Sequence, residues 1–432
     1  MKYFFFGTIL TIYMANRLKT LFEPDGEGTL ISDLSSTSTR TLFYYDNISR
    51  IPVVKLAKLN GVRVGHKKLL NLEEGQTHHM ITRSLRPLMF EVPHFLSDAE
   101  CDHIIEIASE QEFEESMTTN SCASKEAEGK EIQADEDCNN LIRDFDSDSD
   151  GQISPYEFNL YIEEYSSVYR YYLEDIKRMW EVGNVDTNHD GFLDLNECIN
   201  ADTSALEELL TDYEKNPTYR ARYSDHTWLP VDNVIDSTLK RIQQRLSKLI
   251  QMPIEILEKS EEMQVVKYEE SGHFHAHYDS KRGTPVNETT LPCCPLTKFL
   301  NGDSELIRPD GKCHLCRFMS VVYYLNDVTA GGETAFPVAD NETFDDEELK
   351  RQGIVNLSKY CNKSNVIMKP AKGTAIFFYN HHIDQETGQI GPVDKYSLHG
   401  GCDVKEGSKW IATTWVNIPH FIRRKIQGHG LP

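Results

Sequence analysis

The chain of 432 residues lacks an apolar run long enough to cross a bilayer comfortably. Its N-terminal run, "YFFFGTILTIYMA" from Tyr3 to Ala15, falls short of the about 20 residues that a spanning helix needs. A short apolar run between Lys2 and Arg17 is typical of a secretory signal, although no A-x-A-like cleavage site follows it. Residues 1–20 are therefore predicted to be a short signal-anchor or a cleaved signal peptide, with a buried core helix as the remaining alternative.

An excess of basic residues is also lacking. Lys and Arg total 45 against 68 Asp and Glu, which gives a net charge of −23, and residues 91–200 alone hold 29 acidic and 6 basic residues. The remainder of the chain is balanced, so we expect no basic face and no nucleic-acid partner. With 39% hydrophobic residues, the chain can form packed cores for two or three domains.

The chain contains ten cysteines, an even number that is compatible with disulfides in the secretory pathway. Five sequons agree weakly with that compartment. Four cysteines lie in one loop region, and nothing around its "CHLC" segment resembles thioredoxin. We expect either disulfides that staple a lid or a structural zinc site for these four: Cys293, Cys294, Cys313 and Cys316.

The N-terminal third divides by composition. Residues 21–85 are predicted to be a stalk and an N-terminal region, of which 51–85 contain short apolar runs that suggest no particular element. Residues 86–140 are predicted to begin a catalytic domain with a strand and a helix capped at Ser97 or Asp98. Residues 112–137 are acidic and poor in large apolar groups, so we expect a mobile loop there.

Two calcium-binding loops follow within residues 141–200, an expected EF-hand pair. "DSDSDGQISPYE" and "DTNHDGFLDLNE" match the twelve-residue EF-hand loop, with glycine at position 6 and glutamate at position 12. Ile153 and Leu193, at position 8 of each loop, are expected to pair as short strands. The predicted calcium ligands are Asp146, Asp148, Asp150, Gln152 and Glu157 in the first loop, and Asp186, Asn188, Asp190, Phe192 and Glu197 in the second.

The pattern becomes helical from Leu206 to Ile250 and then changes to short strands from Met263 onward. Glycine, proline and asparagine separate these strands. Several short strands at this spacing predict a β sandwich, a jelly roll or a barrel.

The segment "SGHFHAHYDS" places His273, His275, His277 and Asp279 at every second position. Residues at this spacing share one face of a strand, so the four side chains are expected to form a row. Iron(II) in O₂-using enzymes is held by two histidines and one carboxylate. His277 and Asp279 can supply two of these ligands, and a distant histidine has to complete the set.

His399 offers that ligand, and Lys409 follows ten residues later on an expected strand. With "GGETAFP" at 331–337, the pattern His277-x-Asp279, His399 and Lys409 resembles the prolyl 4-hydroxylases over roughly residues 86–420. The resemblance implies an α+β fold: a double-stranded β-helix (jelly-roll) core at 201–420, with flanking helices and an inserted EF-hand pair. Together with the N-terminal apolar segment, the EF-hand pair is similar to the membrane-bound branch of that family in the endoplasmic reticulum.

The same resemblance implies the roles of individual residues. His277, Asp279 and His399 would bind iron, and 2-oxoglutarate would be bound by Lys409, Tyr268, Thr334, Thr413, Tyr324 and Trp415. For Tyr324 and Trp415, plain core packing is the alternative. The family does not use His273 and His275 as ligands, so packing is expected for both. A three-histidine site or a zinc site that uses His275 and His277 is the rival interpretation.

By this resemblance the chain is an Fe(II)- and 2-oxoglutarate-dependent dioxygenase that hydroxylates proline at C4 in a protein substrate. Hypoxia-inducible factor α is the suggested substrate, ascorbate and Ca²⁺ are expected cofactors, and a luminal catalytic domain at the endoplasmic reticulum membrane is the expected location. Two alternatives stay open: a calcium sensor or buffer on an inactive oxygenase scaffold, and an oxygenase whose target is not proline.

Overall fold

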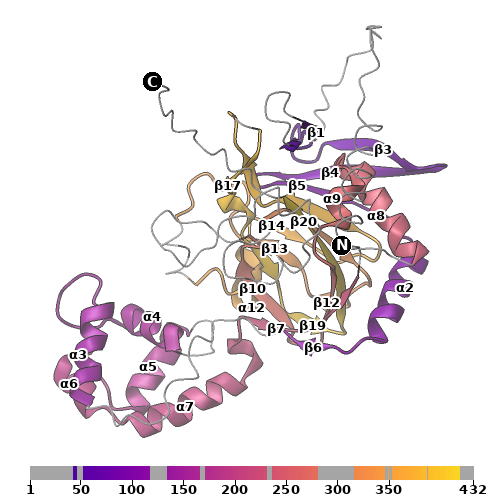
Figure 1. Cartoon of the computed structure of the whole chain (residues 1–432). Coiled ribbons are helices and arrows are strands. Elements are labelled where there is room, and N and C mark those ends of the chain that lie inside the picture. Colours follow the sequence, from indigo (N-terminus) through magenta and orange to yellow (C-terminus); the bar gives the residue numbers. More distant parts are fainter. Residues whose placement is uncertain are drawn as a thin grey trace, which may run out of the picture.

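The structure is a computed structural model that describes residues 42–45, 52–116, 134–165, 171–230, 236–280, 316–345, 349, 353–386 and 388–418. The expected N-terminal signal segment and the cysteines Cys293, Cys294 and Cys313 lie outside these residues. Figure 1 shows a β-rich core with helices against it and a separate group of helices beside it. None of the described helices combines the length and the apolar character that a membrane span requires.

The core contains a nine-stranded antiparallel sheet. Its strands run in the order β3 (Lys67–Glu73), β4 (Gln76–Leu85), β5 (Leu88–Val92), β15 (Ala375–Tyr379), β11 (Cys316–Tyr324), β20 (Lys409–Ile418), β9 (Met263–Tyr268), β8 (Asp225–Leu229) and β6 (Glu114–Glu115). Strands β9, β11, β15 and β20 confirm four of the predicted strands.

A five-stranded antiparallel sheet faces the large one. Its order is β14 (Val366–Met368), β13 (Thr334–Phe336), β18 (His399–Gly401), β10 (His273–His277) and β7 (Arg222–Tyr223). Three two-stranded pairs complete the β structure: β1 (Leu42–Tyr45) with β2 (Pro52–Lys55), β12 (Ala330–Gly331) with β19 (Val404–Glu406), and β16 (His381–Ile383) with β17 (Ile390–Val393).

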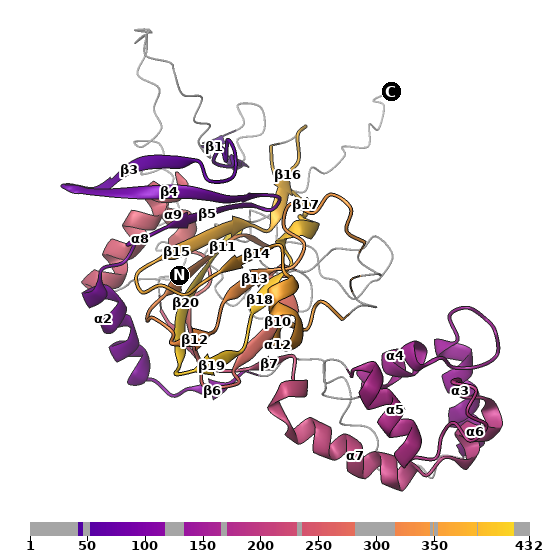
Figure 2. The same cartoon turned by 180° about the vertical axis from the view of Figure 1, so that it is seen from behind.

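Apolar side chains of both sheets form one buried cluster, which includes Val322, Phe336 and Phe378. A larger cluster fills the other face of the nine-stranded sheet, against the helices α2 (Asp98–Ser109), α8 (Ser237–Ile250) and α9 (Ile254–Glu258). Figure 2 shows these helices gathered on one side of the core. Two packed sheets with helices against one of them agree with the predicted jelly-roll core.

Two short helices, α12 (Leu357–Tyr360) and η3 (Cys361–Lys363), lie between β13 and β14 of the smaller sheet, and η4 (Lys395–Ser397) leads from β17 into β18. A disulfide between Cys361 and Cys402 ties η3 to the end of β18.

Two segments go beyond the sequence-based prediction or differ from it. Strands β3 and β4 fall within residues 51–85, for which the sequence suggested no particular element; they pair with each other, and β4 pairs with β5 of the core sheet. Residues 222–229, in the expected helical stretch, form β7 and β8. Neighbouring strands decide both cases, because β8 aligns with β9 and β7 aligns with β10. The expected helix cap is confirmed: Ser97 and Glu100 form a capping box at the start of α2.

The helical unit comprises α3 (Ala134–Phe145), α4 (Pro155–Tyr165), α5 (Leu173–Val182), α6 (Leu195–Asn200), α7 (Thr203–Lys215) and η1 (Pro217–Tyr219). It has its own buried core, which includes Trp180, Leu209 and Tyr213 and therefore extends beyond the expected limit at residue 200. The expected pairing of Ile153 with Leu193 is present as a β-bridge. A disulfide between Cys138 and Cys198 joins α3 to α6.

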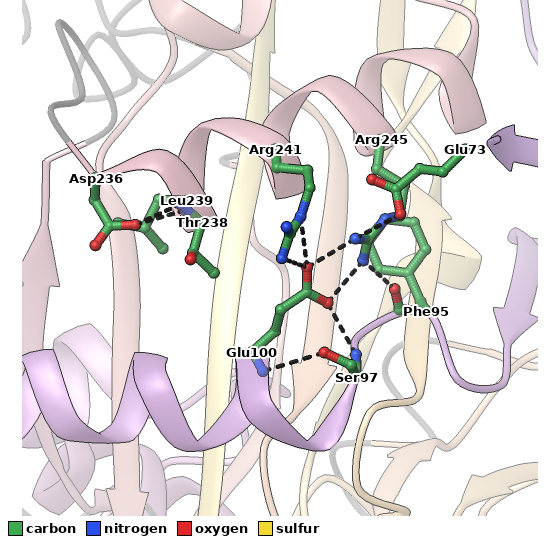
Figure 3. A network of polar contacts seen from close by, with 9 residues as sticks. All are labelled: Glu73, Phe95, Ser97, Glu100, Asp236, Thr238, Leu239, Arg241 and Arg245. Atoms are coloured by element: carbon green, nitrogen blue, oxygen red, sulfur yellow. Dashed lines mark hydrogen bonds and ion pairs between the residues drawn. The ribbon is translucent and has the colours of Figure 1, made fainter. Parts of the chain in front are cut away.

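A buried ion-pair network joins α2, α8 and the β3 end (Figure 3). Arg245 bonds both carboxylate oxygens of Glu100 at 2.7 and 3.0 Å and contacts Glu73 at 2.8 Å, while Arg241 bonds Glu100 from the exposed side. Burial alone would raise the pKa of Glu100, but the bonds from Arg245, Ser97 and Arg241 lower it to about 2. Glu100 is therefore ionised at neutral pH, and its pairing stabilises the fold above its unfolded-state pKa.

We expect Arg245→Ala to lower the free energy of unfolding by about 3 kcal/mol, because it removes the buried partner of the Glu100 carboxylate and leaves the partly exposed Arg241 to pair with it. Urea denaturation at pH 7 measures the loss, and it should shrink as the pH falls toward 2 and Glu100 is protonated in the folded state. The matched control is Arg143→Ala, which removes an exposed pair with Asp144 and should have a much smaller effect, because water screens exposed charges. Equal effects of the two substitutions would contradict the assigned role.

Candidate active site

The site is built on the pairing of β10 with β18. Phe274 lies opposite Gly401 and His277 opposite His399, so β10 carries one extra residue, a β-bulge, between these two pairs. A Cβ on Gly400 would lie 2.3 Å from the Phe274 carbonyl oxygen, so only glycine allows the strands to approach this closely. The bulge and the close approach together bring His277 next to His399.

The bulge corrects the expectation that three histidines form one row. His277 stacks on Phe274 at 3.6 Å between ring centroids, whereas His273 and His275 stack on each other at 4.6 Å. His273 is buried and bonds the carbonyl oxygens of Ser271 and Arg220 at 2.8 Å. His273 and His275 therefore pack in the interior, as expected, and the inserted residue turns His277 away from them.

Three side chains converge where a metal ion could be held: the ligating atoms of His277, Asp279 and His399 lie within 4.8 Å of one another. His277 Nε2 is 3.5 Å from Asp279 Oδ1, and His399 Nε2 is 3.6 Å from Asp279 Oδ2. His275 is not a member of this group, which disfavours the three-histidine and zinc interpretations. This set of donors is the one that Fe(II) takes in O₂-using enzymes.

Hydrogen bonds fix the tautomer of both histidines. His277 Nδ1 lies 2.8 Å from the His275 carbonyl oxygen, and His399 Nδ1 lies 2.9 Å from the Ser397 carbonyl oxygen. A carbonyl only accepts, so each Nδ1 carries a hydrogen and each Nε2 is left with a lone pair toward the site. Burial lowers the pKa of His399 to about 4, so this ring is neutral at physiological pH and able to bind a metal.

Asp279 is ionised in the same buried place. Burial by itself would raise its pKa, but the interactions with His399, His277 and Arg317 hold the pKa well below its usual value. Oδ2 accepts hydrogen bonds from the Ser320 hydroxyl and from Trp415 Nε1, the latter at 3.0 Å. Trp415, expected to line the 2-oxoglutarate site or to pack in the core, thus contacts a predicted metal ligand directly.

Lys409 opens β20, as predicted, and its side chain is almost completely buried, with 2% of the residue exposed. Burial lowers its pKa to about 7, and the charge of Glu333 only partly offsets this. No carboxylate of the described residues forms an ion pair with its ammonium group. A buried cation in this state fits a carboxylate ligand, and 2-oxoglutarate has a second carboxylate to offer beyond its metal-chelating keto acid.

The other predicted 2-oxoglutarate residues surround Lys409. Tyr268 pairs with Lys409 across β9 and β20, and the Lys409 ammonium lies 5.2 Å from the Tyr268 ring. Tyr324 is fully buried and donates its hydroxyl to Thr334 Oγ1 at 2.9 Å. Thr413 is buried, four residues along β20 from Lys409. The residues predicted for the metal and for 2-oxoglutarate therefore meet in one region, between the two sheets.

Sequence reasoning missed four polar residues near the site. Ser320 was detectable as the lone polar residue within the apolar segment of β11, and Asn380 as the residue that follows the apolar strand β15. The Arg222 guanidinium lies 4.7 Å from the ring of Phe274, and that of Arg317 lies 3.6 Å from the ring of Trp415. No local sequence signal marks the two arginines, because strand pairing alone brings them to the site.

The EF-hand loops have the predicted geometry in part. Gly151 and Gly191 at position 6 adopt positive φ values of 85° and 87°, which the sharp turn of this loop requires. In the first loop, the carboxylates of Asp146, Asp148 and Glu157 lie within 4.8 Å of one another, whereas the second loop brings no such group of three together among the described residues. Glu197 accepts bonds from the Thr187 and Asn188 amides at 3.0 and 3.1 Å, much as Glu157 accepts one from the Ser147 amide at 2.7 Å.

Of the four cysteines in the lid region, Cys316 lies among the described residues. It is disulfide-bonded, and its partner lies outside them. This favours the disulfide interpretation over zinc for that cysteine.

The site can now be compared with known proteins. Residues 263–417 match the 2OG-Fe(II) oxygenase superfamily. The human transmembrane prolyl 4-hydroxylase is 36% identical over 376 residues, which cover 84% of this chain and 70% of the human protein. The chain belongs to the prolyl 4-hydroxylase family.

Two further matches cover less of this chain and have lower sequence identity. Prolyl 4-hydroxylase 2 of Arabidopsis thaliana is 30% identical over 243 residues, 54% of this chain and 67% of that protein. A solved viral collagen prolyl hydroxylase from Paramecium Bursaria Chlorella virus-1 covers 49% of this chain and 88% of its own, at 22% identity and a TM-score of 0.29. Family membership identifies this chain as an Fe(II)- and 2-oxoglutarate-dependent enzyme.

The pKa of Lys409 predicts how 2-oxoglutarate binding varies with pH. Only the ammonium form attracts a carboxylate, and in the free protein this form is lost as the pH rises through about 7. Binding raises the pKa of Lys409, so we expect the affinity to be highest below pH 7 and to fall by up to about tenfold per pH unit above it.

Calorimetric titration of the metal-loaded, anaerobic protein between pH 6 and about pH 9 measures this dependence. Pyruvate, a 2-oxo acid without the second carboxylate, is the control ligand and should show no such decline. In Lys409→Met the decline should also disappear, together with most of the affinity for 2-oxoglutarate. A wild-type affinity that does not change over this range would contradict the assignment of Lys409.

Proposed function

We propose that this chain hydroxylates C4 of a proline in a protein substrate, with His277, Asp279 and His399 holding iron and Lys409 holding 2-oxoglutarate. The observation that carries the proposal is the convergence of two imidazoles and one ionised carboxylate beside a buried lysine that has no anionic partner among the described residues. Membership of the prolyl 4-hydroxylase family supports proline as the target.

Iron and 2-oxoglutarate, when bound, supply the oxidation chemistry, in which O₂ and 2-oxoglutarate yield succinate, CO₂ and the hydroxylated proline. The chain supplies position and polarity. His277 and His399 present their Nε2 lone pairs to the metal, because the backbone carbonyls hold their Nδ1 hydrogens. Lys409 orients 2-oxoglutarate by its far carboxylate, and the Phe274, Phe336 and Phe378 rings around the two histidines exclude water. Ascorbate, as a reductant of oxidised iron, belongs to the same proposal.

The test is hydroxylation of proline-containing peptides. With Fe(II), 2-oxoglutarate, O₂ and ascorbate, the wild-type chain should add one oxygen atom to proline and release succinate, whereas His399→Ala should do neither, since it loses one of three metal ligands. Mass spectrometry locates the oxygen, and a peptide with alanine in place of proline is the substrate control.

Peptides from hypoxia-inducible factor α are one arm of this test, since that protein is the suggested substrate. Succinate that forms without hydroxylation of any proline would favour the oxygenase with another target. A folded chain that releases no succinate under any of these conditions would contradict the proposal and favour the calcium-sensor alternative.

The proposal also includes the secretory pathway, with the catalytic domain in the lumen and the N-terminal segment in the endoplasmic reticulum membrane. The two disulfides within the described residues support an oxidising compartment. Among the described sequons, Asn362 is exposed and Asn341 is half-buried, whereas Asn356 is 1% exposed and caps α12, so Asn356 does not suit a glycan in the folded protein.

Calcium binding by the EF-hand loops is a further part of the proposal. The helical unit continues through η1 directly into β7, which pairs with β10 of the metal site. His273 also contacts the Arg220 carbonyl oxygen at 2.8 Å. A change in the helical unit on calcium binding could therefore reach the strand that carries His277. Of the four cysteines of the expected lid, Cys293, Cys294 and Cys313 lie outside the described residues.

We expect Glu157→Gln, which removes the bidentate ligand of the first loop, to weaken calcium binding more than Glu197→Gln does, because only the first loop gathers three carboxylates. Calorimetric titration with Ca²⁺ gives the two affinities. Asp212→Asn, which removes an exposed charge of α7 outside both loops, is the control. If succinate formation by the wild-type chain is unchanged by a calcium chelator, the helical unit has a structural role only.

A further inference from the structure

We propose that Ser320 and Trp415 are positioning residues that restrict Asp279 to one metal-facing oxygen, and so keep a coordination position open for 2-oxoglutarate and O₂. This inference rests on the proposed function. It concerns Oδ2 of Asp279, which receives hydrogen bonds from both residues, whereas Oδ1 accepts none from any described residue.

The two donors are held by strand register. Ser320 of β11 lies directly opposite Trp415 of β20, so their side chains point to the same side of the sheet. The Trp415 ring is covered by the Arg317 guanidinium at 3.6 Å and lies 5.9 Å from the ring of Trp228. Arg317 is in turn fixed by Glu261, which accepts bonds from its Nε at 2.8 Å and its Nη2 at 2.6 Å. The indole therefore has little freedom to turn away from Asp279.

The direction of both hydrogen bonds is determined by chemistry. An indole N–H can only donate. The Ser320 oxygen accepts a bond from Asn380 Nδ2 at 2.8 Å, and the amide nitrogen can likewise only donate, so the hydroxyl hydrogen is directed to Asp279. Asn380, which is completely buried, thus orients Ser320 as a donor.

Two donors saturate the in-plane lone pairs of one carboxylate oxygen, since an ionised carboxylate offers about four acceptor sites on its two oxygens. Oδ1, which is 3.5 Å from His277 Nε2, keeps both of its sites for a metal. Oδ2 is 3.6 Å from His399 Nε2, close enough to reach the same metal if its donors were removed. The two hydrogen bonds therefore decide between binding through one oxygen and binding through two.

This choice matters because an octahedral ion with three protein atoms has three remaining positions, two for the keto acid and one for O₂. A second bond from Asp279 would occupy one of them. Loss of the donors should then weaken the binding of 2-oxoglutarate while the metal itself gains a ligand atom. A residue that only orients a metal ligand behaves differently, since its loss costs about 10- to 100-fold in metal affinity.

The test uses the full chain, saturated with Ca²⁺ and kept anaerobic, and measures two affinities. Competition with a chromophoric chelator gives the affinity for Fe(II), and calorimetry on the iron-loaded protein gives the affinity for 2-oxoglutarate. In the double variant Ser320→Ala/Trp415→Phe, we expect the affinity for 2-oxoglutarate to fall by about tenfold or more. The affinity for Fe(II) should stay unchanged or increase.

Tyr379→Phe is the matched control, because it removes a buried hydroxyl from the adjacent strand β15 that bonds Leu59 and not Asp279. It should leave both affinities unchanged. If the double variant does not fold, the single variant Ser320→Ala should also bind 2-oxoglutarate more weakly, to a smaller extent, without weaker binding of Fe(II). Ser320→Thr, which keeps the hydroxyl, should bind both as the wild type does.

Equal losses of both affinities, or an unchanged affinity for 2-oxoglutarate, would overturn the inference. A wild-type chain that binds neither Fe(II) nor 2-oxoglutarate would instead contradict the proposed function, so the two failures are distinguishable.

Discussion

The close approach of β10 and β18 at Gly400 is the constraint on which the site depends. A side chain at this position would collide with the Phe274 backbone, and the strands could not pair as they do. The pairing, together with the bulge in β10, sets His277 opposite His399 and directs the chain onward to Asp279. The three predicted metal ligands come from two distant parts of the sequence, and they converge because the backbones of β10 and β18 are in contact.

The two sheets bury the predicted metal ligands in an environment that excludes water and contains few charged side chains. Aromatic rings pack on both histidines, and the same burial that keeps His399 neutral also destabilises the charged form of Lys409. No carboxylate of the described residues pairs with Lys409, and a buried charge without a partner reduces the stability of the free protein. In the proposed site, the far carboxylate of 2-oxoglutarate would relieve that cost, and Lys409 would then favour dicarboxylates.

Much of this was accessible from the sequence, because spacing and residue type carry it. The pattern His277-x-Asp279, the later His399 and Lys409 were predicted and meet in space, and the short strands predicted from Met263 onward are present. The expected row of histidines was wrong, because one bulge residue breaks the two-residue period. Partners from other strands, such as Ser320 beside Trp415, were not predictable, because they depend on strand register, which no local pattern encodes.

The most direct test of the central claim is an anaerobic titration of the chain with Fe(II) and 2-oxoglutarate, followed by the visible charge-transfer band between the metal and the keto acid. A band that forms in the wild type and is absent in Asp279→Ala would agree with an oxygenase site at His277, Asp279 and His399. A folded wild-type chain that binds calcium and develops no band would contradict it.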